Sequence, residues 1–140
     1  MNLSSVRQAI ASKVAALTGF QETTHSPDQF GRTQNTVAHQ AFAVGMSSSS
    51  SMEERQRRAV GVYMNTPVEV MFSYRLRPLD IYPTDYDLAL DAEQTVITGI
   101  LGAYTDGTEF SIRYVNSVRT VTDSQEYIII TILFETLHTI

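Results

Sequence analysis

The sequence of 140 residues contains no cysteine. A disulfide framework, a catalytic thiolate and a cysteine-bound zinc site are therefore excluded, and the absence fits a reducing compartment such as the cytosol. A chain of this length buries roughly 70% of the surface that its unfolded form exposes. We therefore expect residues 1–140 to form a single domain that needs no cross-link. The hydrophobic content of 43% is that of a globular protein.

Long apolar runs and an excess of positive charge are also missing. No stretch reaches the roughly 18 apolar residues of a membrane-spanning helix, and the N-terminus lacks the basic-then-apolar layout of a signal peptide. We therefore expect no membrane partner. Ten basic against 15 acidic residues give a net charge of −5, whereas a dedicated nucleic-acid-binding protein usually carries the opposite sign.

The residue patterns of common catalytic sites are absent as well. The seven glycines are scattered rather than gathered in a phosphate-binding loop, and the serine run 47–51 has no nucleophile-elbow context. None of the histidines His25, His39 and His138 has a second ligand at metal-binding helix spacing. We therefore predict no catalytic residue, no metal and no cofactor, and we interpret the protein as one that is not an enzyme.

Two segments have helical periodicity. Apolar residues recur every three or four positions from Ser5 to Leu17, with Ser5 near the start as a cap, and Gly19 follows as a helix stop. A second helix is predicted from Thr84, as its cap, to Gly102. Its predicted inward-facing residues are Tyr86, Ala89, Leu90, Val96, Ile97, Ile100 and Leu101.

Five acids surround the start of this second helix: Asp80, Asp85, Asp87, Asp91 and Glu93. They include pairs suited to acid–base catalysis or to calcium binding. Their place near a helix N-terminus has a sufficient electrostatic explanation, however, and Asp87 with Asp91 forms an exposed pair four residues apart. We interpret the cluster as structural.

Alternating apolar residues predict strands over 37–46, within 55–77, over 109–121 and over 127–137. The order helix, strand, strand, helix, strand, strand predicts an α+β fold: a mostly antiparallel sheet of four to five strands with two helices packed on one face. Two excursions, near 20–36 and 46–56, are predicted to be flexible. The predicted core includes Val70, Phe72, Ile97, Ile130 and Ile132.

Two strands carry irregularities. The segment 109–121 loses its alternation around Asn116 and Ser117. For residues 55–77, which contain Pro67, one long bulged strand and a hairpin remain alternatives.

The last predicted strand is apolar on both faces. One row is Ile128, Ile130, Ile132 and Phe134, and the opposite row is Tyr127, Ile129 and Leu133. Two helices cover one face of a sheet of this size but hardly both. We therefore predict that the Tyr127, Ile129 and Leu133 row contacts another subunit.

A second candidate contact is the basic cluster Arg55, Arg57 and Arg58, next to the serine-rich run. One interpretation is a solvated strand end of mixed charge. The other is a contact with an acidic partner surface, because binding sites concentrate on such loop tips.

A capped helix precedes the strand His39 to Val44, and a polar excursion leads to the strand Val68 to Pro78. An acidic helix and two terminal strands follow, the last one containing Thr131 to Glu135. This layout resembles the tail terminator (tail completion, minor tail) proteins of long-tailed bacteriophages. The resemblance covers nearly all of the sequence in pattern rather than in a signature motif, and the serine-rich excursion with the extended segment 55–64 departs from it.

The resemblance implies a homohexameric ring that caps the phage tail tube, ends tube polymerisation and offers a docking surface to the head–neck connector. DNA would pass through the lumen without sequence-specific binding. The protein would reside in the tail or neck of the virion after synthesis in the host cytoplasm. The alternatives are another neck or head-completion protein, and a small-ligand-binding α+β module or enzyme.

Overall fold

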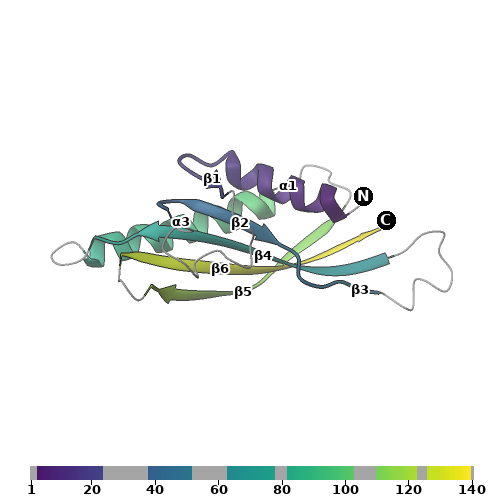
Figure 1. Cartoon of the computed structure of the whole chain (residues 1–140). Coiled ribbons are helices and arrows are strands. Elements are labelled where there is room, and N and C mark those ends of the chain that lie inside the picture. Colours follow the sequence, from purple (N-terminus) through teal and green to yellow (C-terminus); the bar gives the residue numbers. More distant parts are fainter. Residues whose placement is uncertain are drawn as a thin grey trace.

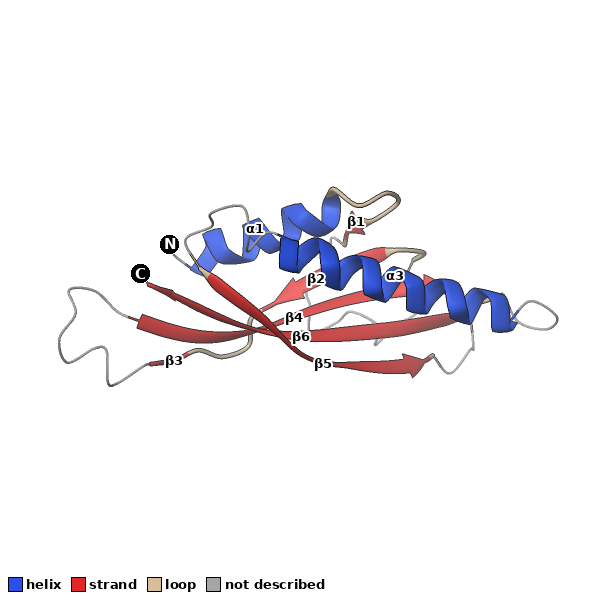
Figure 2. Ribbon diagram, turned by 180° about the vertical axis from the view of Figure 1, so that it is seen from behind, coloured by secondary structure: helices blue, strands red, loops and turns tan. Residues whose placement is uncertain are grey.

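The computed structural model describes residues 3–23, 38–51, 63–77, 82–102, 110–122 and 126–139, and the account below is confined to them. Two helices, α1 (Leu3–Ala15) and α3 (Tyr82–Gly102), lie side by side on the same face of a twisted sheet (Figures 1 and 2). Neither of them is long and apolar enough to cross a membrane. The fold is α+β, as the sequence predicts.

The sheet consists of β1 (Gln21–Glu22), β2 (Ala41–Gly45), β3 (Ser50–Ser51), β4 (Tyr63–Arg75), β5 (Ser111–Val121) and β6 (Tyr127–Thr139). Its strand order is β1-β2-β4-β6-β5, and β3 also pairs with β4. All pairings are antiparallel except the short parallel pair of β1 with β2. The four longer strands confirm the predicted ones, and the two-residue strands β1 and β3 are added to them.

The central pair of β4 and β6 runs without a register shift from Tyr63↔Thr139 to Arg75↔Tyr127. Residues 63–75 are therefore one continuous strand without a bulge, and residues 55–62 lie outside the described part of the sequence. Pro67 is one of the odd-numbered residues of β4, whose backbone groups point toward β2 and β3 instead of β6. Pro67 falls between the segments that these two strands pair with, where its missing N–H costs no ladder bond.

Strand β5 contains a β-bulge at the place where the sequence alternation fails. Its pairing with β6 shifts between Tyr114 and Asn116, which leaves Val115 as the extra residue. Before the bulge the even-numbered residues face the helices, and after it the odd-numbered residues do so. Ile112 is buried on the helix side, and Arg119 reaches the same side from beyond the bulge.

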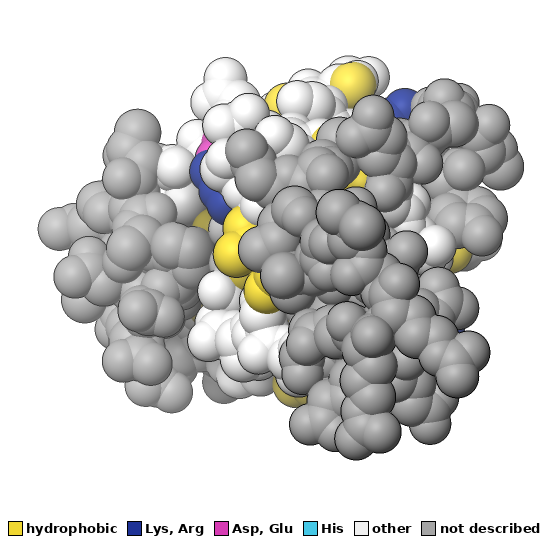
Figure 3. Space-filling model, turned by 90° about the vertical axis from the view of Figure 1, so that its right-hand side faces the viewer, with side chains coloured by type: hydrophobic (Ala, Val, Ile, Leu, Met, Phe, Trp, Pro, Cys, Tyr) yellow, Lys and Arg dark blue, Asp and Glu magenta, His cyan; other side chains and the backbone are white. Residues whose placement is uncertain are grey.

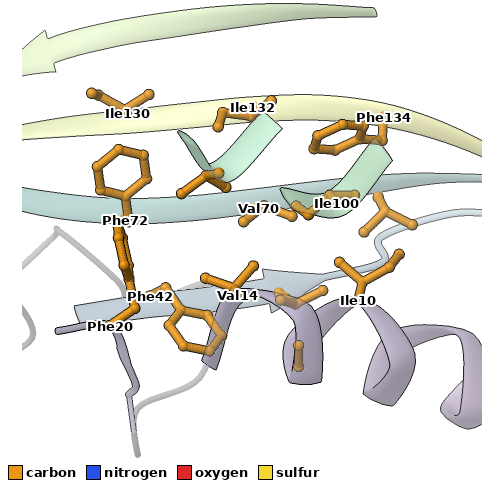
Figure 4. Packing of buried hydrophobic residues seen from close by; sticks show 14 of the residues in the cluster. Ile10, Val14, Phe20, Phe42, Val70, Phe72, Ile100, Ile130, Ile132 and Phe134 are labelled. Atoms are coloured by element: carbon orange, nitrogen blue, oxygen red, sulfur yellow. The ribbon is translucent and has the colours of Figure 1, made fainter. Parts of the chain in front are cut away.

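The core lies between the helices and the inner face of the sheet (Figure 4). The predicted core residues Val70, Phe72, Ile130 and Ile132 are fully buried, whereas Ile97 is only partly buried at its margin. Helix α1 contributes the predicted side chains Val6, Ile10 and Val14. The ring of Phe20 packs edge-on against Phe72, with centroids 5.4 Å apart.

Helix α3 buries the predicted residues Ala89, Val96 and Ile100. Its fully buried side chains follow a spacing of three and four residues: Asp85, Ala89, Glu93, Val96 and Ile100. The predicted Tyr86, Leu90, Ile97 and Leu101 are only partly buried beside this row. Two residues of the buried row, Asp85 and Glu93, were not among the predicted inward-facing residues; Arg77 and Arg119 pair with them.

The helix starts also differ from the prediction. Helix α1 begins at Leu3 and α3 at Tyr82, so Ser5 and Thr84 lie inside first turns instead of capping them. At the other end of α1, Gly19 adopts the predicted left-handed conformation with φ 85°. It closes the turn that leads into β1.

Part of each predicted excursion is paired. Gln21–Glu22 extends the sheet beside β2, and Ser50–Ser51 pairs with Met64 and Asn65 of β4. The serine run is therefore not an unpaired tip throughout, because backbone ladder bonds do not depend on side-chain packing. Residues 24–37 and 52–62 lie outside the described residues.

Candidate assembly surface

The sheet face turned away from both helices is called the open face here (Figure 2). Its residues are the odd-numbered ones of β6 and β4 and, beyond the bulge, the even-numbered ones of β5. The register places Leu133 between Glu69 and Asn116, and Thr131 between Met71 and Val118. Neither α1 nor α3, the helices of the described residues, covers this face.

The predicted contact residues Tyr127, Ile129 and Leu133 all lie on the open face. Each is partly buried by its neighbours, whereas Ile128 and Ile130, which alternate with them, are buried under the helices. Strand β6 is therefore covered on one side and half-exposed on the other within the described residues. The row therefore lies on the face opposite the helices but is partly buried, and its contact with another subunit stays a prediction.

The register adds apolar neighbours that the sequence analysis missed. Met71 is partly buried beside Thr131, Val118 is 58% exposed on the other side of the same residue, and Leu137 is 41% exposed further along β6. We call Met71, Val118, Ile129, Leu133 and Leu137 the apolar strip. Val118 was missed because the bulge at Val115 moves it to this face.

A polar cluster joins three strands at one end of the open face. Glu135 of β6 accepts hydrogen bonds from the Asn65 amide of β4 and from the Arg113 guanidinium of β5. These bonds, that from Arg113 foremost, hold the pKa of Glu135 below its ordinary value. Toward this end of the molecule, where the termini and β3 lie, Figure 3 shows hydrophobic side chains gathered beside a basic side chain.

The cluster leaves one acceptor unsatisfied. The Oδ1 atom of Asn65 is buried and has no hydrogen-bond partner, although the Nδ2 atom of the same amide donates to Glu135. A buried acceptor without a partner costs about 1–3 kcal/mol. The cost falls within the subunit, because the atom has no surface that another molecule could reach.

The structure does not describe the second predicted contact, the basic cluster next to the serine-rich run. Arg55, Arg57 and Arg58 lie outside the described residues, and so does His25. The nearest described segment on their N-terminal side is β3, where Ser49 Oγ lies 2.9 Å from Thr66 Oγ1.

A buried polar network stands on the helix side of the same strands. Thr66 Oγ1 lies 3.0 Å from His138 Nε2, and the hydroxyl of Thr136 donates to the Thr66 carbonyl at 2.7 Å. His138 is buried near the end of β6, where it pairs with Met64 of β4. The network extends the core with satisfied polar groups at the end of the sheet.

Two arginine–carboxylate pairs hold α3 on the sheet. Arg77 donates to Asp85 through Nε at 3.0 Å, through Nη2 at 2.8 Å and through its backbone N–H at 2.7 Å. Arg119 donates to Glu93 at 2.8 and 2.6 Å. Bidentate pairs of this kind fix orientation as well as charge. The side-chain hydrogen bond of Arg77 lowers the pKa of Asp85.

These pairs occupy two of the acids around the start of α3, whereas Asp87 and Asp91 are exposed and Asp80 lies outside the described residues. Asp85 and Glu93 are each saturated by a different arginine. Among the residues that the structure describes, no three His, Asp or Glu side chains gather as a metal site would require.

Comparison of the sequence with protein-family models and with curated proteins finds no match.

Proposed function

We propose that this protein is a structural subunit that assembles with copies of itself, and that the assembly is the homohexameric ring capping the tail tube of a long-tailed phage. The single observation that supports self-assembly is the apolar strip of the open face, where Val118 is 58% and Leu137 41% exposed. The tail location rests on the resemblance of the sequence layout.

Physical chemistry favours covering this face. Apolar area removed from water contributes roughly 25 cal/mol per Å², and a contiguous apolar patch on a monomer is an aggregation liability. A ring solves both problems when the open face of one subunit contacts a different surface of the next, because such a head-to-tail contact closes after a fixed number of copies. Function then follows from binding alone.

In the proposed ring one rim contacts the last layer of tail tube protein and the other rim contacts the head–neck connector. The tube stops growing because the exposed rim no longer offers the surface that adds a layer. The net charge of −5 is compatible with a lumen through which DNA slides, because acidic side chains repel phosphate.

Sedimentation velocity of four proteins tests the proposal. We expect wild type to form a six-fold ring, alone or with tail tube protein, and Leu133→Asp to stay monomeric, since the change places a charge in the apolar strip. Leu88→Asp is the matched control, because Leu88 is 45% exposed on α3, away from the open face. Ile130→Ala should assemble but lose about 2–5 kcal/mol of stability, because it opens a cavity in the core.

A ring of unchanged size in Leu133→Asp would contradict assembly through the open face, and so would a wild type that stays monomeric with tube protein present. A tube-length assay tests the position. Added protein should cap polymerising tubes and limit their length. Rings that form but leave tube growth unchanged would refute the terminator role and favour another neck position.

A further inference from the structure

Residues 38–40, which precede β2, bind to the end of β4. The Gln40 N–H donates to the Ser73 carbonyl at 2.7 Å, and the Ala38 N–H donates to the Ser73 hydroxyl at 3.3 Å. The Gln40 carbonyl in turn accepts a hydrogen bond from the N–H of Gln21 in β1 at 3.1 Å. The segment therefore connects β1 with the end of β4.

A side chain replaces the backbone at the last position of this contact. The register of β2 with β4, if continued, would pair His39 with Arg75 through backbone hydrogen bonds. A positive φ of 57° at Gln40 and a turn bond from the Ala41 N–H to the Ala38 carbonyl take the chain off this register. The Nδ1 atom of His39 instead accepts from the Arg75 N–H at 3.2 Å.

This hydrogen bond requires a neutral imidazole. An accepting Nδ1 places the ring hydrogen on Nε2, whereas a protonated ring carries hydrogens on both nitrogens and has no acceptor left. The ring stands edge-on to Tyr74, with centroids 4.5 Å apart. His39 is exposed, so protons reach the ring, and it lines a pocket of about 240 Å³ that gives the ring room to turn.

The described charged and titratable side chains that line this pocket with His39 come from both sides. Tyr74 and Arg75 belong to β4, Arg77 follows it, and Asp85 belongs to α3. Arg77 donates to both oxygens of Asp85, and burial raises the pKa of the Tyr74 hydroxyl, which is therefore neutral near pH 7. Partial burial of the ring and then the Arg75 charge lower the pKa of His39, and Asp85 raises it by less.

We propose that His39 is a pH-sensitive switch: the neutral ring holds residues 38–40 against the end of β4, and its protonation frees the Arg75 N–H and lets the ring turn away from Tyr74. The opening is local, because the hydrogen bonds to Ser73 involve no titratable group. No residue of the apolar strip takes part, so the switch does not depend on ring assembly.

The direction of the pH effect follows from linkage. The folded-state pKa of His39 lies below the ordinary value of 6.5. The stabilisation by its hydrogen bond is therefore complete above that pH and is lost as the pH falls through the folded-state pKa. In mildly acidic solution the connection from β1 to the end of β4 loosens.

NMR of the full chain between about pH 5 and 8 tests the switch. We expect the neutral His39 ring to carry its hydrogen on Nε2 and to titrate below the pKa of a model peptide. The protection factor of the Arg75 amide against hydrogen exchange should fall about twofold to tenfold as the ring is protonated, the range that corresponds to one hydrogen bond. The amide of Ile132, in the centre of the sheet, is the internal reference for global unfolding.

Two variants separate the acceptor from the ring. His39→Asn offers an amide oxygen that does not titrate, so the Arg75 amide should stay protected over the whole range. His39→Phe keeps a ring beside Tyr74 without an acceptor, so the Arg75 amide should be as open near pH 8 as it is in acidified wild type.

A wild-type Arg75 protection factor that stays constant while His39 titrates overturns the proposal. So does a neutral His39 ring with its hydrogen on Nδ1, or a His39→Asn protein that keeps the pH dependence. The wild-type titration alone decides the proposal if a variant does not fold.

Discussion

Asp85 is a buried acid that contributes both to the electrostatics and to the packing of α3. It is buried in the first turn, where the positive end of the helix dipole favours an acid, and it accepts three hydrogen bonds from Arg77. The carboxylate thereby joins the end of β4 to the start of α3. Removing its charge would leave the N–H donors of Arg77 without their acceptor.

The acid sensitivity of the fold should depend on Asp85. Because its folded-state pKa lies below the ordinary value of 3.8, its stabilisation is complete above that pH and is lost as the pH falls through the folded-state pKa. Asp85→Asn should therefore lower the melting temperature at neutral pH and flatten its fall below about pH 4. Thermal unfolding from pH 2 to 7 measures both effects.

Asp87→Asn is the matched control, because Asp87 is exposed two positions further along the same helix. It should change the melting curve little. Equal acid sensitivity of wild type and Asp85→Asn would show that the Arg77–Asp85 pair does not stabilise the fold.

At the scale of elements, the connection from α1 to β1 depends on one backbone conformation. Gly19 has φ 85°, and a Cβ atom there would lie 2.4 Å from Oε1 of Gln40, in the turn before β2. Gly99 of α3 is a second close approach, because a Cβ atom there would lie 3.3 Å from Leu17. The side of α3 that carries Gly99 thus faces Leu17, in the segment just after α1.

Gly19→Ala should destabilise the fold by about 1–2 kcal/mol, since the left-handed conformation disfavours a Cβ atom and the Gln40 side chain must also move. Gly102→Ala is the control, because nothing lies within 4 Å of its Cβ position and its φ is not in the left-handed region. Urea unfolding compares the two variants. A loss for Gly19→Ala no larger than that for Gly102→Ala would contradict the strain argument.

At the scale of the whole molecule, the two described helices cover one face of the sheet (Figure 2). Both helices lie on one face, and the apolar strip with the Asn65 cluster occupies the other. If assembly covers the open face, folding and association are coupled by mass action.

The melting temperature of wild type should therefore rise with protein concentration, and that of Leu133→Asp should stay constant. Leu88→Asp should follow wild type. Differential scanning calorimetry over a hundredfold range of concentration measures the slopes. A flat wild-type curve, or an equal slope for Leu133→Asp, would show that the open face is not buried in an assembly.

Local sequence patterns determined the two helices, the four longer strands and the row of residues on each face of β6. They did so because hydrophobic periodicity is set by the geometry of one element at a time. Val70, Phe72 and Ile130 were correctly predicted as core on this basis. The failure of alternation near Asn116 likewise marked the bulge in β5.

Only the tertiary structure decided which partner each polar residue meets. Asp85 and Glu93 of α3 are buried together with their partners Arg77 and Arg119, which lie outside the helix. Residue spacing within α3 alone cannot predict these two pairs. The same holds for the pairing of β3 with β4. Long-range pairing joins residues far apart in the sequence, and periodicity within one element carries no information about it.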